Sequence, residues 1–131
     1  MLITSHTMLR KGMPIVMIGR HDDRGTVVAT PWTVAAVGKK QIYLTSPAGN
    51  AKFRLWSSHL AEPRTFFRLI TTDNIDADAM QVATEWHAIL LADLHRCIAH
   101  NAGDEHAGYR RQLHRELDAM HEPRVIHRLP E

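Results

Sequence analysis

The residues most suited to chemistry in the first half of the chain are cations set among aromatic rings. Two lysines, Lys39 and Lys40, lie in the short segment GKK between the apolar runs TVAAV (33–37) and QIYLT (41–45). These runs predict two strands joined by a hairpin turn, with both lysines at the tip. Side chains alternate between the two faces of a strand, so Tyr43 lies opposite the Ile and Leu of its own strand.

The next run, KFRLW (52–56), predicts another strand that continues this pattern. If its Phe and Leu face the core, its two cations and its Trp lie on the opposite, outer face. Cations neutralise phosphates, and aromatic rings stack on unpaired bases. The predicted nucleic-acid-binding residues are Lys39, Lys40, Tyr43, Lys52, Arg54 and Trp56. The alternative is that the helices cover both rings and the cations only solvate a sheet edge.

Histidines suggest a second kind of site, one for a metal. His114, Asp118 and His121 are spaced at i, i+4 and i+7 in a predicted helix, where they could share one face. Imidazole and carboxylate are suitable zinc ligands. No cysteine pair accompanies them, and such spacing arises easily by chance on a solvated helix. We therefore expect no metal or other cofactor, and keep these three residues as the candidates should a metal be found.

Catalytic signatures are missing from the sequence. It contains no glycine-rich phosphate loop, nucleophile elbow or zinc-protease motif. The triplet HDD (21–23) belongs to RHDDRG, which is polar turn chemistry rather than a metal-binding helix. We expect a non-enzymatic binding protein, and a small metal-dependent enzyme built from the helical histidines remains the alternative.

Short apolar runs bounded by turn residues organise the first half of the chain, and this spacing is typical of a small barrel or a strongly bent sheet. Pro31 interrupts a strand ladder and predicts an edge or a bend. The predicted strands are PIVMIG (14–19), TVVAT (26–30), TVAAV (33–37), QIYLT (41–45) and KFRLW (52–56), with FFRLI (66–70) as a closing strand.

Helical periodicity organises the second half. Apolar residues recur at three and four positions through 75–100, and a second helix is predicted at roughly 105–121. The predicted fold is therefore α+β, with an N-terminal small antiparallel β-barrel followed by a C-terminal helical hairpin. The barrel-like domain covers 1–72, and the hairpin with its C-terminal tail covers 73–131. Trp86 is expected to anchor its helix against the sheet.

Charge divides the chain in the same way. Residues 1–71 carry a net charge of +7 and residues 72–131 a net charge of −5, which together give the overall +2. An acidic surface repels nucleic acid, so the helices are expected either to dock on the basic sheet of their own chain or to meet another molecule. We favour the second outcome, in which the partner is a basic protein or a second copy of the chain, in a homodimer. The expected protein-interface residues are Asp76, Asp78, Glu85, Trp86 and Asp93.

The compartment is predicted from cysteine usage and from apolar runs. A single cysteine, Cys97, excludes an intrachain disulfide and fits a reducing compartment. No apolar run reaches the roughly 18 residues of a membrane span, and no secretion signal precedes the first strands. We therefore expect a cytoplasmic protein without membrane contact.

The stretch GTVVATPWTVAAVGKKQIYLTSPAGNAKFRLWSSH resembles small SH3-like or KOW-like barrels, including short barrel proteins encoded by bacteriophages. The likeness rests on a hairpin of the form valine–glycine–basic–basic–x–aromatic, followed by a basic–aromatic–basic strand. It implies a binding module for RNA, DNA or protein and assigns no catalytic residue. The alternative function is a phage-encoded or host-directed inhibitor or adaptor of the anti-defence type, which acts through its acidic helices.

Overall fold

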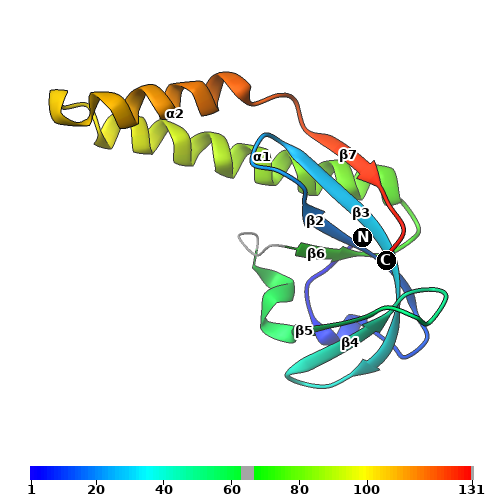
Figure 1. Ribbon diagram of the computed structural model, residues 1–131. Coiled ribbons are helices and arrows are strands. Elements are labelled where there is room, and N and C mark those ends of the chain that lie inside the picture. Colours follow the sequence, from blue (N-terminus) through cyan, green and yellow to red (C-terminus); the bar gives the residue numbers. More distant parts are fainter. Residues whose placement is uncertain (63–66, 131) are drawn as a thin grey trace.

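The computed structural model describes residues 1–62 and 67–130 and shows an α+β protein (Figure 1). These residues form a seven-stranded sheet and two α-helices, joined by three short 3-10 turns. The strands are β1 (Leu2–Ile3), β2 (Pro14–Arg20), β3 (Thr26–Val37), β4 (Gln41–Thr45), β5 (Lys52–Trp56), β6 (Phe67–Ile70) and β7 (Arg124–His127). The helices are α1 (Ile75–His100) and α2 (Ala107–Ala119), and the 3-10 turns are His6–Met8, Ser57–Ala61 and Asp104–His106.

The strands follow the order β1-β6-β2-β3-β4-β5, with β7 beside β3, and the sheet is open. In the described residues β1 and β5 do not pair with each other, so the predicted closed barrel is not confirmed. The predicted closing strand is β6, and position 66 of that run lies outside the described residues. Instead of closing the sheet against β5, β6 lies between β1 and β2, antiparallel to both.

Strand β3 carries the bend of the sheet. Strand β2 pairs along one edge, whereas β7 pairs with Thr26–Ala29 and β4 with Thr33–Val37 on the other edge. The carbonyl oxygen of Ala29 accepts the N–H of Arg128 at this second edge. The backbone N–H and C=O groups of residues two apart in a strand point to the same edge. Pro31 lies two residues after Ala29, so its nitrogen faces the gap between β7 and β4. Proline therefore breaks no hydrogen bond, and the strand continues through it.

Two cores pack on the opposite faces of the sheet. The inner face, which the bend encloses, holds one buried cluster, and the outer face packs against α1. The inner core comprises Ile3, Leu9, Ile15, Trp32, Val34, Ile42, Leu44, Leu55, Leu60 and Leu69. The outer core comprises Val16, Ile18, Val27, Ala29 and Ile70 from the sheet with Ala79, Val82, Ala83 and Trp86 from α1. Trp86 is 1% exposed, so the prediction that it anchors the helix on the sheet is confirmed.

The helices differ from the predicted hairpin in their relation to the sheet. The first half of α1 packs on the sheet, and the chain returns to the sheet after α2 as β7, the only parallel pairing among the described strands (Figure 1). The helices therefore follow the sheet instead of forming a separate hairpin. Only the second half of α1 runs past the sheet, where it contacts α2. The predicted bounds 75–100 match α1, whereas α2 is shorter than the predicted 105–121.

The polar turn between β2 and β3 takes the conformation that its residues favour. Asp22 Oδ1 accepts the backbone N–H groups of Arg24 and Thr26, at 2.9 Å and 3.1 Å. Gly25 has φ of 120°, and a Cβ there would lie 3.0 Å from the carbonyl oxygen of His121. Glycine is needed both for the backbone angle and for this close approach. The turn is thereby joined to the segment that leads from α2 into β7.

Candidate nucleic-acid interface

The outer face of β4 and β5 carries the predicted basic and aromatic side chains. Register pairs Gln41 with Trp56, Tyr43 with Arg54, and Thr45 with Lys52. Tyr43 is 43% exposed and Trp56 is 49% exposed, while the alternate residues of these strands face the inner core. The predicted alternation along both strands is therefore confirmed. Among the described residues, α1 packs on β2, β3, β6 and β7 and lies away from β4 and β5 (Figure 1).

The hairpin tip is held beside the end of β5 by backbone contacts. The Gly38 N–H donates to the carbonyl oxygen of Gln41 at 2.8 Å, which closes the turn. Ser57 Oγ donates to the carbonyl oxygen of Lys39 at 2.5 Å, and the Ser57 N–H donates to that of Lys40 at 2.9 Å. Both lysine side chains remain exposed. The tip lysines thus lie next to Trp56 and extend the same surface. We call this surface the ribbon face, and it comprises Lys39–Gln41, Tyr43, Lys52, Arg54 and Trp56.

The cations of the ribbon face have no acidic partner among the described residues. Across residues 1–62 and 67–130, neither tip lysine, nor Lys52, nor Arg54 forms an ion pair with a carboxylate. Each of the four residues is exposed. Exposed cations without acidic neighbours produce a positive potential that attracts anions.

Two hollows adjoin each other on the ribbon face, one on either side of Tyr43. The tip hollow, about 640 Å³, is lined by Tyr43, Trp56 and the turn from Gly38 to Gln41. The strand hollow, about 540 Å³, lies between Tyr43 and the cations Lys52 and Arg54. The Tyr43 hydroxyl donates to Gln41 Oε1 at 2.6 Å, which ties the ring to its own strand. Both hollows therefore share the Tyr43 ring as a wall, and this ring is held by its hydrogen bond to Gln41.

Sequence reasoning did not select Gln41 or Ser57. Gln41 lies two residues before Tyr43, so strand alternation alone places it on the same face. Its contact with the tyrosine hydroxyl gives it a part in the site. The role of Ser57 depends on backbone contacts to the tip across a gap of 18 residues, and no local sequence signal indicates it.

The predicted protein-interface residues of α1 lie apart from the ribbon face, and each carboxylate has a partner in its own chain. Asp76 Oδ1 is 3.3 Å from His127 Nε2, and Asp78 contacts the amino group of Met1. Glu85 is 3.5 Å from Arg68, and Asp93 is 2.6 Å from Arg96. Trp86 was wrongly placed at an intermolecular surface, because it lies inside the core between α1 and the sheet.

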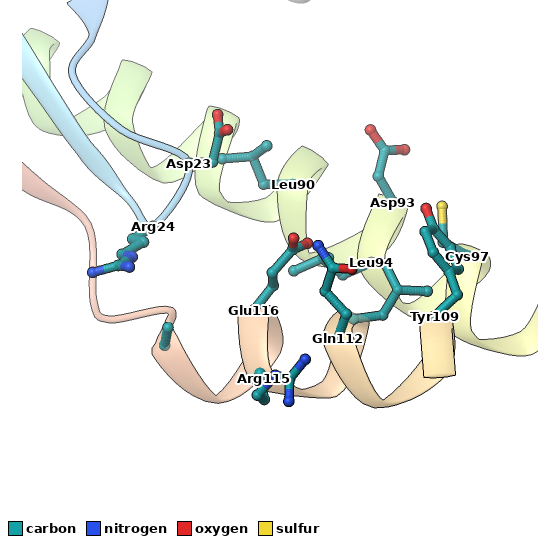
Figure 2. A pocket seen from close by; sticks show the side chains of 12 residues that line it. Asp23, Arg24, Leu90, Asp93, Leu94, Cys97, Tyr109, Gln112, Arg115 and Glu116 are labelled. Carbon is teal, nitrogen blue, oxygen red and sulfur yellow. The ribbon is translucent and has the colours of Figure 1, made fainter. Parts of the chain in front are cut away.

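A larger groove lies between α1 and α2, beside the turn that joins β2 and β3 (Figure 2). Its volume is about 810 Å³. Figure 2 shows Leu90, Leu94 and Cys97 on the α1 side and Tyr109 and Gln112 on the α2 side, with Arg24 on the β2–β3 turn. Charged groups of both signs also line the groove, namely the carboxylates of Asp23, Asp93 and Glu116 and the guanidinium groups of Arg24 and Arg115. The groove thus combines an apolar floor with a rim of mixed charge.

The three candidate metal ligands do not come together. Helix α2 ends at Ala119, so His121 leaves the helical register on which the i, i+4, i+7 prediction depended. Its Nδ1 hydrogen-bonds the carbonyl oxygen of Glu122, and its Nε2 is 3.1 Å from Thr26 Oγ1. His114 and Asp118 stay exposed on α2. In the part of the chain that is described, no three His, Cys, Asp or Glu side chains are close enough to hold one ion.

None of the described helices has the length and apolar character required to cross a membrane. Comparison with family models, with curated proteins and with solved structures finds no match for this chain.

Proposed function

We propose that the protein binds nucleic acid through the ribbon face. The observation that carries the proposal is the combination of two large exposed rings, Tyr43 and Trp56, with four exposed cations that have no acidic partner in the described chain. A folding protein gains free energy by burying such rings, so their exposure at the centre of a cationic surface favours a role in binding.

Nucleic acid suits this surface better than an acidic protein does. Its backbone presents regularly spaced negative charges, which the tip lysines, Lys52 and Arg54 neutralise with release of counterions. Its bases present flat faces for the two rings. The acidic α1 lies at the opposite end of the molecule from β4 and β5 (Figure 1), which orients an approaching polyanion toward the ribbon face.

A salt titration with charge-reversed variants tests the proposal. The double variant Lys39→Glu, Lys40→Glu should weaken oligonucleotide binding and reduce the slope of log K against log salt. Each lost phosphate contact changes that slope by about 0.7 to 0.9. The matched control is Arg111→Glu, Arg115→Glu, which makes the same charge change on the exposed surface of α2.

The two double variants must behave differently if the ribbon face binds. Affinity is measured by anisotropy of a labelled oligonucleotide, from low salt upward. The α2 control should keep most of the affinity and the original slope. Equal losses of affinity in both variants would show that only the net charge of the protein matters, and would contradict a binding site on the ribbon face. No binding by the unmodified protein at low salt would end the proposal.

A protein-binding inhibitor or adaptor is the second candidate, and the groove between α1 and α2 is the observation that favours it. Because Asp76, Asp78, Glu85 and Asp93 already have partners in the chain, the groove supports this function better than their negative charge does. We further propose that the bent sheet is an open variant of the SH3-like barrels that its central stretch resembles. Such modules serve both kinds of binding, so this likeness does not decide between them.

A further inference from the structure

We infer that the ribbon face takes single-stranded nucleic acid and holds two adjacent unpaired bases, one in each hollow beside Tyr43. This inference rests on the proposed nucleic-acid binding and makes it narrower. Three cross-strand pairs form the row on which the strand would lie, from Gln41–Trp56 to Thr45–Lys52. At a rise of roughly 3.3 Å per residue this row is about 13 Å long, which limits the contact to a short segment.

The central ring is restrained in the free protein. The hydroxyl of Tyr43 is held by Gln41, and the ring separates the tip hollow from the strand hollow. A ring that is already ordered loses little conformational entropy when a base stacks on it. Tyr43 is therefore the residue that both bases contact, one on each side.

The two hollows differ in their second wall. In the tip hollow a base lies between Tyr43 and Trp56, and the adjacent phosphate meets Lys39 and Lys40. In the strand hollow the base meets Arg54 beside Tyr43, and Lys52 takes the next phosphate. A guanidinium plane and an aromatic ring are both suitable stacking partners for unpaired bases.

Gln41 supplies polar recognition in the tip hollow. Its Oε1 accepts the tyrosine hydroxyl, which leaves the two amide hydrogens as donors toward the base edge. A base with a carbonyl oxygen on that edge accepts such a donor. The amide thus contributes a preference among bases that stacking alone does not provide.

A duplex does not use this surface. Its bases are stacked on one another, so Tyr43 and Trp56 would meet only edges and backbone. The rival geometry is the hairpin of β3 and β4 entering a major groove as a two-stranded ribbon, with the tip lysines leading. That geometry predicts a preference for duplex, which makes the two arrangements distinguishable.

Tryptophan fluorescence locates the bases in the intact protein. Trp56 is exposed, whereas Trp32 and Trp86 are 8% and 1% exposed. A base stacked on Trp56 should quench the solvent-exposed part of the emission and leave the two buried residues unchanged. The probes are single strands of about eight nucleotides in RNA and DNA form, the matching duplexes, and an abasic strand with the same phosphates.

Single strands with bases should bind at least about ten-fold tighter than the duplex or the abasic strand, and only they should quench Trp56. Trp56→Ala and Tyr43→Ala should each weaken single-strand binding by about 5- to 150-fold, the range for base stacking on an aromatic ring. Trp56→Phe should retain most of the affinity. Tyr109→Ala removes an equally exposed ring from the groove between α1 and α2, away from the ribbon face, and should leave the affinity for single strands unchanged.

Other results separate failure of this inference from failure of the proposed function. Equal affinity for the abasic strand would keep phosphate binding and overturn base stacking. Tighter binding of duplex would overturn the single-strand assignment in favour of the ribbon in the groove. Binding by none of the probes at low salt would overturn the inference and the proposed function together. Urea denaturation of each variant establishes that it is folded, since these exposed rings lie outside both cores.

Discussion

The outer face of the sheet has two halves that differ in what covers them. On β2, β3 and β6 the face packs under α1, and two arginines that project from it are largely enclosed. Arg20 stacks on Trp86, with Cζ 5.3 Å from the ring centroid, and Arg68 is 4% exposed and faces Glu85. On β4 and β5 the same face carries Lys52 and Arg54 in solvent. Both halves carry cations, but only those of the covered half are enclosed in the fold.

This difference indicates which aromatic residues serve folding. Trp86 completes the outer core, whereas Trp56 is half exposed and belongs to neither core. Truncating a side chain that stabilises the fold lowers the free energy of unfolding. Truncating a side chain that binds a ligand lowers the affinity and leaves the stability nearly unchanged. Stability and binding measured on the same variants therefore test the comparison directly.

The largest expected effect is on stability at Trp86. Trp86→Ala removes the central ring of the outer core and should lower the free energy of unfolding by about 3 to 5 kcal/mol. Trp56→Ala should change it by no more than about 0.5 kcal/mol, because that ring is half exposed and belongs to neither core. Urea denaturation followed by circular dichroism gives both values. A loss at Trp56 as large as that at Trp86 would contradict the division of the face.

A smaller effect is expected from the buried cation. Glu85→Ala leaves the Arg68 guanidinium enclosed without its carboxylate and should cost about 1 to 3 kcal/mol. Arg68 Nε already has no hydrogen-bond partner in the described residues, so little else can compensate. The double variant Arg68→Met, Glu85→Ala should recover most of that stability, since an apolar pair often replaces a buried ion pair without loss.

The matched control for the arginine lies on the uncovered half. Arg54→Met should leave the unfolding midpoint unchanged, because Arg54 is solvated and has no acidic partner among the described residues. If Glu85→Ala were also neutral, water would reach Arg68 despite its burial. Arg68 on the covered half and Arg54 on the uncovered half would then both be solvated, although their exposed fractions differ.

The smallest effect is a dependence of stability on pH at the β2–β3 turn. Partial burial raises the pKa of Asp22. Hydrogen bonds from Arg24 and Thr26 and the charge of His121 together lower it by more, so the pKa is below 3.8. A lowered pKa in the folded state contributes stability above pH 3.8, which is lost as pH falls through the folded value. Asp22→Asn should remove this part of the acid dependence.

Asp23→Asn is the control, because it removes the same charge from an exposed neighbour. A hydrogen bond from Thr71 lowers the pKa of Asp73 as well, but both variants retain it, so the comparison isolates Asp22. Melting temperatures between pH 2.5 and pH 7 supply the measurement. Parallel curves for Asp22→Asn and the unmodified protein would show that the turn does not depend on this carboxylate.

Local patterns were sufficient to predict most elements and every residue of the ribbon face except Gln41. The alternation in QIYLT and KFRLW gave the correct outer side chains, and the apolar spacing gave the bounds of α1. The edge strands β1 and β7 were missed, because β1 has only two residues and β7 lacks the buried apolar run that marks β6. The metal hypothesis for His121 depended on a helix two residues longer than α2.

By itself, the sequence determined which side chains share a face within each strand and which residues form α1, because both follow from the periodicity of the local backbone. Only the tertiary structure decided which half of the outer face is covered. Arg68 and Arg54 both occur beside apolar residues in short β strands, yet one is enclosed by α1 and the other is in solvent. Burial depends on where a helix distant in sequence packs, and α1 extends along β2, β3 and β6 without reaching β4 and β5.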